Sequence, residues 1–523
     1  MSVLWGYITP GRIGEPARQR GKAAAALEKT SLRRVTQLFL RWKLTLFAIA
    51  IACPGHDGYD TSTGILFDQH RASGQASWFA YVVESVARKL TRWDPIYFVS
   101  SASRGYVYEQ EWAFSRFMSG LTSFVARVLF SYLPLSHIVK CALAGILLSV
   151  AAHFAATVIL YNFVHFLTPA SDTRKRQLAF TTACLHVLSP AGIFLLAGYH
   201  ESAFALLNFL GLYCYATAVD NRFATYADAY QIDAVWTIFA GFWFGLASMV
   251  RSNGLLSGII FAWDAVAMLP RLPDILRTRD TERITRFTAT IVAGTLLAIG
   301  FVAPQVSGYL HYCTAGETRP WCNKFPPSIY SFVQSHYWDV GFLRYWKISN
   351  LPLFALVFPV GWLMVETSFP SLFQAHHVNR AINGSTEADQ KLQDYPPTPS
   401  TRAEKVFLHC LPRFALPQLI LVGMAATTFH CQILNRISSG YPIWYLIIAA
   451  EICIMKWEPG ASPRLEKEIR AGSGDQRKGT KGMFRLFGDY GRIPFARPEW
   501  VLRGFVGYAV VQAGLFAAFL PPA

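Results

Sequence analysis

The chain has 523 residues, a formal net charge of +16 at pH 7 and a mean hydropathy of +0.28. Hydrophobic residues make up 53% of the chain and charged residues only 15%, against roughly 25% charged residues in soluble domains. This composition excludes a soluble globular domain and predicts a protein that crosses a lipid bilayer several times. The basic residues gather in short segments between apolar runs. That is the positive-inside pattern of membrane topology and not the signature of a nucleic-acid partner.

The N-terminal segment 1–35 is polar and basic, and we expect it to lie in the cytosol without being a cleaved signal peptide. An apolar run at 36–54 predicts the first span. The long polar and aromatic segment 55–120 is then lumenal. Residues 121–134 fit either an interfacial helix or a span, and both alternatives stay open.

Ten further apolar runs are near the length of about 20 residues that a spanning helix needs. They predict spans near 138–168, 178–197, 202–219, 235–250, 253–270, 287–306, 351–367, 412–430, 440–456 and 499–520. The fold class is thus an all-α polytopic membrane protein with about eleven transmembrane helices. Its spans hold few ionisable residues away from their ends.

The loops divide the chain into simple parts. Residues 36–456 form one membrane domain with lumenal loops 55–120 and 307–349, and the basic segments 271–286 and 457–498 are cytosolic loops. Residues 499–523 supply the final span and a lumenal C-terminus. The sequence Asn383-Gly-Ser385 matches a glycosylation sequon, but in this topology it faces the cytosol and stays unmodified.

Two of the nine cysteines, Cys313 and Cys322, share a polar lumenal loop. They could form a local disulfide in an oxidising compartment such as the endoplasmic reticulum (ER) lumen, or stay as two free thiols. No cysteine and histidine cluster has the spacing of a metal site, so we expect no metal.

Polar chemistry collects in the lumenal loops, where Asp60, Trp93, Asp94, Glu109 and Glu111 lie among aromatic residues. This distribution favours a lumenal catalytic or binding face over a transporter, which needs polar groups deep within several spans. Asp94, between Trp93 and a proline, could act as a general base on a sugar hydroxyl. The alternative is an aromatic belt at the membrane interface with Asp94 as a helix N-cap.

Three further polar segments border apolar spans on the same predicted face. His200 and Glu201 begin one span, where the helix dipole would also favour the acid. Arg251 and Asn253 sit between two spans, and Arg436 precedes another. Either arginine could pair with a lipid phosphate, although for Arg251 snorkelling to the interface is an equally good explanation.

The ordered set of these motifs resembles the GPI mannosyltransferase 2 family. The matching segments are Gly58-Tyr-Asp-Thr-Ser-Thr63, Arg92-Trp-Asp-Pro-Ile-Tyr-Phe98, Gly105-Tyr-Val-Tyr-Glu-Gln-Glu-Trp-Ala-Phe114, His200-Glu-Ser202, Arg251-Ser-Asn-Gly254 and the stretch 435–445. Phe114-Ser115 departs from the Phe-Pro of the family, and 457–498 looks like an insertion.

The resemblance implies a polytopic GT-C glycosyltransferase of the ER membrane that adds the second, α-1,6-linked mannose to a GPI precursor from dolichyl-phosphate mannose. It implies inversion at the sugar, no cofactor beyond the lipid-linked donor, and room for a small membrane-protein subunit. Another GT-C transferase, acting on N-glycan precursors or protein hydroxyls, is the closest alternative. A transporter or a noncatalytic ER scaffold is a more distant one. The expected catalytic residues are Asp94 and Glu109, and the expected substrate-binding residues are Asp60, Trp93, Glu111, His200, Glu201, Arg251, Asn253 and Arg436.

Overall fold

The computed structural model describes residues 15–54, 59–69, 77–314, 319–383, 401–457 and 498–520, and every regular element within these ranges is a helix. The all-α prediction is confirmed. The predicted cytosolic loop 457–498 lies outside the described residues except for its two ends. Which side of the membrane each loop faces stays a prediction.

Nine helical segments of the described chain are long and apolar enough to cross a bilayer, and a bent pair adds a tenth. They lie in α1 (Glu15–Ala52), α6 (His137–Leu167), α8 (Glu201–Arg222), α9 (Ala229–Val250), α10 (Gly258–Met268) with its flanking helices η3 (Ser252–Ser257), η4 (Leu269–Arg271) and α11 (Leu272–Thr278), α12 (Thr281–Tyr312), α14 (Leu351–Phe373), α17 (Arg402–Thr427) and α21 (Pro498–Ala517). The bent pair is Cys431–Gly440 followed by α19 (Pro442–Trp457), with an angle of 73° between them.

The structure breaks the predicted span 178–197. Helix α7 (Asp172–Val187) has only 16 residues, and a buried irregular stretch with the short helix η2 (Gly192–Leu195) follows it. Pro190 and Gly192 interrupt the helix here. Gly192 has φ +28°, and a Cβ on it would lie 2.7 Å from the Cβ of Ala509 in α21, so only glycine fits. The count of about eleven spans is therefore approximate.

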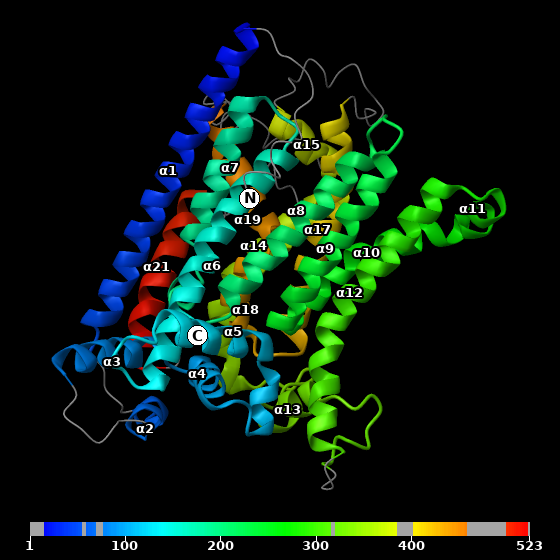
Figure 1. The fold of residues 1–523 in the computed structure, drawn as a ribbon. Helices are drawn as coiled ribbons and strands as arrows, with labels where there is room; N and C mark the ends of the chain where they lie inside the picture. The colour runs from blue at the N-terminus through cyan, green and yellow to red at the C-terminus, as the bar shows by residue number, and fades with distance from the viewer. Residues whose placement is uncertain are drawn as a thin grey trace, which may run out of the picture.

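Short helices gather at one end of the bundle, seen at the bottom of Figure 1. They are α2 (Ser62–Asp68), α3 (Trp78–Leu90), α4 (Asp94–Arg104), η1 (Glu109–Ala113), α5 (Arg116–Leu129) and α13 (Ile329–Tyr337). Helix α5 covers most of the ambiguous segment 121–134. With 14 residues it is too short to span, and it exposes Phe124 and Val128 one turn apart. The alternative of a span is therefore wrong, and the position of α5 at the membrane interface stays a prediction.

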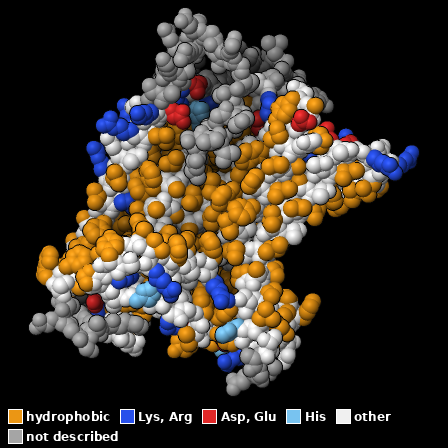
Figure 2. Space-filling model, viewed as in Figure 1, with side chains coloured by type: hydrophobic (Ala, Val, Ile, Leu, Met, Phe, Trp, Pro, Cys, Tyr) orange, Lys and Arg blue, Asp and Glu red, His pale blue; other side chains and the backbone are white. Residues whose placement is uncertain are grey.

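The spanning helices pack around a continuous apolar core that includes Phe204, Phe209 and Phe244. Helices α1 and α21, from opposite ends of the chain, lie side by side (Figure 1). Figure 2 shows hydrophobic side chains over the middle of the visible face and most Lys and Arg side chains near its two ends. That distribution is typical of a protein surface in contact with lipid.

The spans contain more buried polar groups than the sequence led us to expect. Asp264 of α10 is hydrogen-bonded by Arg413 Nε at 2.8 Å and by Arg222 Nη1 at 3.2 Å. Lys43 and His153 are also buried within spans. Pairing explains Asp264, because an ionised carboxylate inside a bilayer is stable only with a partner.

Candidate functional site

Two carboxylates and two arginines alternate in a chain of contacts at the end of the bundle where the short helices gather. Arg436 Nη2 donates a hydrogen bond of 2.6 Å to Asp94 Oδ2, and Arg436 Nε lies 3.3 Å from Glu201 Oε1. Arg251 Nη1 donates to the same Glu201 oxygen at 2.8 Å. We name Asp94, Arg436, Glu201 and Arg251 the charge cluster. Its formal charges cancel.

The four side chains come from helix ends that are far apart in the sequence. Asp94 begins α4 and Glu201 begins α8, while Arg251 directly follows α9 and Arg436 lies in the short helix α18 (Leu434–Ile437). Both carboxylates therefore sit at the positive end of a helix dipole. The sequence placed Asp94 as a possible N-cap, but Trp93 occupies that position and Asp94 is the first helical residue.

The backbone before Asp94 is strained. Trp93 has φ +62° and ψ −126°, a conformation that costs a bulky L-residue about 1–3 kcal/mol. The Trp93 ring contacts Tyr59 and Phe519, with ring centroids 5.7 and 5.2 Å away. Those contacts hold the conformation that starts α4 at Asp94. Strain of this kind is common where a side chain must be aimed at a ligand.

Two aromatic rings that the sequence analysis missed flank the Arg436 guanidinium. The centroids of Tyr199 and Phe194 lie 5.1 and 5.5 Å from its central carbon, within the range of a cation–π interaction. The Tyr199 hydroxyl also donates to the backbone carbonyl of Arg92 at 3.4 Å. Tyr199 directly precedes His200 and Glu201, and this position beside two candidate site residues could have identified it from the sequence.

Several polar atoms of this region have no hydrogen-bond partner among the described residues. They are Glu201 Oε2, Arg251 Nε and Trp93 Nε1, and each is buried. Buried polar atoms without partners are rare in folded proteins and are often satisfied by a ligand or water. In addition, Asp94 Oδ1 has no hydrogen bond from the described part of the chain. The site therefore keeps both hydrogen-bond acceptors and hydrogen-bond donors that are available to a ligand.

His200 is packed against the site but turned away from solvent. Its ring stacks on Phe98 with centroids 3.9 Å apart, and only 4% of the residue is exposed. Burial, with a smaller contribution from the charge of Arg251, lowers the pKa of His200 to about 3. The ring is therefore neutral at pH 7. Whether it also contacts substrate stays a prediction.

Asp60 lies in the same region, but its carboxylate is hydrogen-bonded within its own segment. Asp60 Oδ1 accepts a hydrogen bond of 2.7 Å from the backbone N–H of Ser62, at the start of α2. The neighbouring Tyr59 reaches Trp93. Burial raises the pKa of Tyr97, and the negative charges of Asp94, Glu111 and Asp60 act in the same direction.

Glu109 and Glu111 belong to the same predicted lumenal segment as Asp94, but neither pairs with Asp94 in the described part of the chain. Glu111 is buried, pairs with Arg104 at 2.6 Å and accepts from the backbone N–H groups of Val107 and Tyr108. Each of its oxygens is thus used to hold its own loop. Sequence spacing could not show this, because the chain turns away from Asp94 after α4.

Glu109 instead joins the two loops that the sequence predicts to be lumenal. It accepts hydrogen bonds from Trp321 Nε1 at 3.1 Å and from the Tyr337 hydroxyl at 3.4 Å, and Arg319 Nε lies 3.7 Å away. A disulfide between Cys313 and Cys322 closes the segment that carries Trp321. Of the two alternatives that the sequence left open, a disulfide or two free thiols, the structure has the disulfide. Glu109 is placed to fix one loop on the other.

The turn after Arg251 is held from two sides. Asn253 Nδ2 donates to the Tyr441 hydroxyl at 3.2 Å, and that hydroxyl donates back to the Asn253 carbonyl at 3.3 Å. Ser252 and Tyr330 share a hydrogen bond of 2.6 Å between hydroxyls. Tyr441 and Tyr330 thus hold the two residues that follow Arg251, and this fixes the direction of the Arg251 side chain.

This arrangement is suited to transfer chemistry with an anionic leaving group. A carboxylate with one uncommitted oxygen can accept a proton, and two arginines can stabilise negative charge that develops on a phosphate. Among the described residues, no group of three or more His, Cys, Asp or Glu side chains is placed to hold a metal ion.

Comparisons with known proteins give one consistent result. A family model described as "Mannosyltransferase (PIG-V)" matches residues 33–523. A protein of Aspergillus oryzae named GPI mannosyltransferase 2 is 36% identical over 94% of this chain and 96% of its own length. Proteins of the same name from Chaetomium globosum and Gibberella zeae are each 34% identical, over 97% and 94% of this chain and 100% and 97% of their own.

Among solved structures, the apo oligosaccharyltransferase of Archaeoglobus fulgidus aligns with 94% of this chain and 56% of its own. The TM-score is 0.40 and the sequence identity is 13%. This likeness is too loose to place individual residues.

Proposed function

The chain belongs to the PIG-V mannosyltransferase family, and we propose that it adds the second mannose of the GPI anchor in the ER lumen. It is a multi-pass membrane glycosyltransferase of GPI-anchor biosynthesis. The proposed donor is dolichyl-phosphate mannose. The proposed acceptor is a GPI precursor that bears glucosamine and one mannose, and the new bond is α-1,6.

The observation that carries the proposal is the charge cluster, which combines an accessible carboxylate with two arginines. About 29% of the Asp94 side chain is exposed, whereas Glu201 is fully buried. Only Asp94 of these two acids can therefore meet an incoming hydroxyl. In the proposed reaction, Asp94 accepts the proton of the acceptor's 6-hydroxyl as that oxygen bonds to the anomeric carbon of the donor mannose.

The bond from the anomeric carbon to the phosphate oxygen breaks in the same step, and its electron pair leaves with dolichyl phosphate. Because the donor linkage is β and the product linkage α, a single displacement with inversion suffices. The leaving phosphate needs positive charge rather than a proton. We assign that task to Arg436 and Arg251, so the scheme requires no metal and no cofactor.

Glu201 has a supporting role in this scheme. It lies between the two arginines and contacts both. Its buried charge keeps two guanidinium groups together that would otherwise repel each other. A small membrane-protein subunit, which the family resemblance implied, stays a prediction.

Expression of the chain in cells that lack the second GPI mannosyltransferase tests the proposal. The wild-type chain should restore surface GPI-anchored protein and remove the accumulated intermediate with one mannose. An Asp94→Asn chain of equal abundance should do neither. If the wild-type chain leaves the one-mannose intermediate in place but, in separate cells defective in N-glycan precursors or protein O-mannosylation, relieves that defect, the acceptor assignment is wrong.

A further inference from the structure

The end of α21 places an aromatic ring against the residues that lead into Asp94. Phe519 lies two residues beyond the last helical residue of α21 and is fully buried. Its ring meets the Trp93 ring edge-to-face, with centroids 5.2 Å apart. The central carbon of the Arg92 guanidinium lies 4.5 Å from the centroid of the Phe519 ring, within the range of a cation–π interaction. One side chain therefore contacts both residues that precede Asp94.

Phe519 has a backbone conformation that normally belongs to glycine. Its φ is +57°, in the left-handed region that is unfavourable for a bulky L-residue. The N–H of Phe519 donates to the Phe516 carbonyl at 3.1 Å, and the N–H of Leu520 donates to the Leu515 carbonyl at 3.0 Å. These two bonds form the Schellman motif that ends many helices, in which the left-handed residue is usually glycine. Glycine would end α21 with less strain, so the helix cap alone does not explain the aromatic ring.

Phe519 and Trp93 are two strained residues in direct contact. Only five non-glycine residues of the described chain have a positive φ, and two of them are this pair of touching rings. Such strain persists only where the surrounding structure holds it, and it gathers where a functional group must be aimed. The Trp93 conformation starts α4 at Asp94. The packing of Phe519 on Trp93 therefore sets the direction in which the Asp94 side chain leaves the helix.

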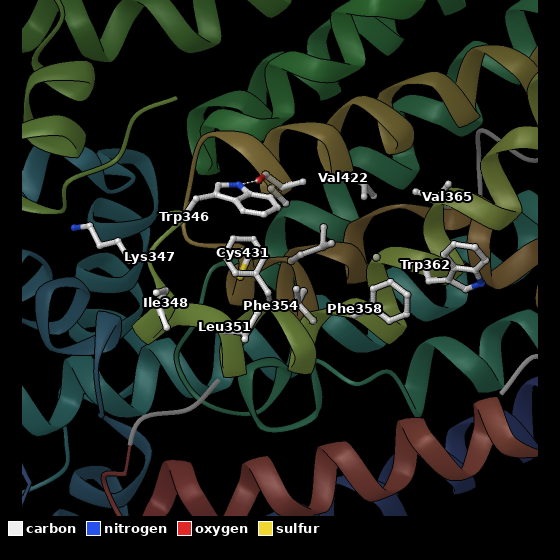
Figure 3. Close-up of a pocket in the computed structure, with 15 residues that line it drawn as sticks. Trp346, Lys347, Ile348, Leu351, Phe354, Phe358, Trp362, Val365, Val422 and Cys431 are labelled. Atoms are coloured by element: carbon white, nitrogen blue, oxygen red, sulfur yellow. Dashed lines mark hydrogen bonds between the residues drawn. The ribbon is translucent and has the colours of Figure 1, made fainter. Parts of the chain in front are cut away.

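The same helix supports the other member of the Asp94–Arg436 pair. The Tyr508 hydroxyl of α21 accepts a hydrogen bond of 2.7 Å from Asn435 Nδ2, and Asn435 directly precedes Arg436 in α18. Another side of α18 borders an apolar pocket along α14, which Leu434 helps to line (Figure 3). A cavity offers no packing atoms, so the contact with α21 carries more of the orientation of α18.

Phe516 of α21 packs on the two rings that flank the Arg436 guanidinium. Its ring centroid lies 6.0 Å from that of Tyr199 and 5.9 Å from that of Phe194. The side chain of Phe516 is fully buried, so these contacts belong to the core of the bundle. Helix α21 thus lies behind both the proposed base and the proposed phosphate-binding group.

We propose that Phe519 is a positioning residue for mannose transfer, which acts through Trp93 on Asp94. The inference rests on the proposed function, with Asp94 as the base, and deepens it by naming the side chain that aims the carboxylate. Because Phe519 is fully buried, it cannot touch donor or acceptor. A shift of about 1 Å in a catalytic group lowers turnover by up to about 10²-fold. Loss of the ring should therefore slow the chemical step and leave the binding of both substrates unchanged.

Helix α21 offers a matched pair of substitutions. Phe519→Leu removes the aromatic ring but keeps a buried apolar side chain and the same backbone strain. Phe505→Leu is the control, because Phe505 is 3% exposed and packs on the Trp444 ring with centroids 5.2 Å apart. The control makes the same chemical change on the same helix, at a position where the ring packs on Trp444 instead of Trp93. Phe519→Met, whose flexible side chain fills irregular space, takes the place of Phe519→Leu if that variant does not accumulate.

The test measures kcat and KM for mannose transfer by the purified full chain, together with thermal unfolding in detergent. Phe519→Leu should lower kcat about tenfold and change KM for donor and acceptor by less than about twofold. Phe505→Leu should keep kcat near wild type, although both variants lose thermal stability. In an Asp94→Asn background, Phe519→Leu should lower kcat by less than about a further twofold, because no base is left to aim.

Equal kcat values of Phe519→Leu and Phe505→Leu, or a loss confined to KM, would overturn the proposal. The same fractional loss in the wild-type and Asp94→Asn backgrounds would also contradict it, since a purely structural role acts in both. If Asp94→Asn loses transfer but Phe519→Leu does not, the positioning role fails and the proposed function stands. A wild-type chain that transfers no mannose to a GPI precursor would overturn the proposed function, and this inference with it.

Discussion

Arg436 Nη2 donates a hydrogen bond of 2.6 Å to Asp94 Oδ2 across 342 positions of sequence. This contact joins the segment 55–120, predicted to be lumenal, to a helix near the end of the membrane domain. It also joins the proposed base to a proposed phosphate-binding group. In the proposed reaction, a donor phosphate that approaches Arg436 would compete with Asp94 for the same guanidinium. Binding of the donor and release of the base would then be coupled.

Substitution of Arg436 tests this coupling. Asp94→Asn and Arg436→Gln should each lower transfer at least about tenfold, and the double variant should lose much less than the product of the two effects, because interacting residues are not additive. Measured kcat/KM values of the four chains give the coupling energy. Arg283→Gln, which removes an exposed ion pair with Asp280, is a control that should stay near wild type. Strictly multiplicative losses would show that the two side chains act independently.

Tyr199 is a positioning residue for Arg436. Tyr199→Phe keeps the ring beside the guanidinium and should retain most activity. Tyr199→Leu removes the cation–π contact and should lower kcat/KM about five- to thirtyfold, as expected for ~1–2 kcal/mol. Kinetics of both variants at equal protein level check this. Equal losses in the two variants would assign the effect to the hydroxyl, which both variants lack.

The burial of His200 predicts a pH dependence of stability. Its folded-state pKa is about 3, below the unfolded value of about 6.5, so the unfolded chain binds a proton first as the pH falls. This group therefore costs the folded state about 2 kcal/mol between pH 6.5 and pH 5. His200→Gln should lose less stability than wild type over that interval, measured by thermal unfolding in detergent. Parallel pH profiles of the two chains would show that His200 is accessible to protons.

The disulfide gives a direct test of the lumenal loop. With Cys313 and Cys322 bridged, a membrane-impermeant thiol reagent should label this loop in opened microsomes only after reduction. A Cys313→Ser chain leaves Cys322 unpaired and should be labelled without reductant. If the wild-type loop is labelled in the absence of reductant, the bridge is absent from the protein in the membrane.

The arrangement of spans was readable from the sequence because apolar length is a strong signal in a bilayer protein. The exception, residues 178–197, shows its limit. The run is apolar throughout, yet Pro190 and Gly192 end the helix and the remainder folds into a buried turn beside α21. Hydropathy measures burial in apolar surroundings, and an irregular segment inside a bundle satisfies it as well as a helix does.

The sequence identified most residues of the candidate site but not the contacts between them. Asp94, Glu201, Arg251 and Arg436 were each singled out from local motifs, but no periodicity could show that they touch. Glu109 was grouped with Asp94 through sequence proximity, whereas it contacts Trp321 of the other loop. Pairings between segments hundreds of residues apart depend on the packing of the whole bundle.

The buried ion pairs at the opposite end of the bundle could not be predicted from the sequence for the same reason. Arg222 and Asp233 are joined by hydrogen bonds of 3.1 and 3.3 Å. Each residue lies near the end of a predicted span, where a charge needs no partner to be plausible. Their mutual burial follows from the packing of α8 against α9, which one sequence cannot specify.

The most direct measurement of the central claim is mannose transfer by purified Asp94→Asn enzyme as a function of pH. The substitution keeps size and hydrogen bonding but removes the base, so turnover should fall about 10²-fold or more at neutral pH. It should recover partly at high pH, where hydroxide can deprotonate the acceptor, while protein level and thermal stability stay close to wild type. Near-normal turnover of Asp94→Asn, together with loss of turnover in Glu109→Gln or Asp60→Asn, would place the base on a different lumenal carboxylate and contradict the account.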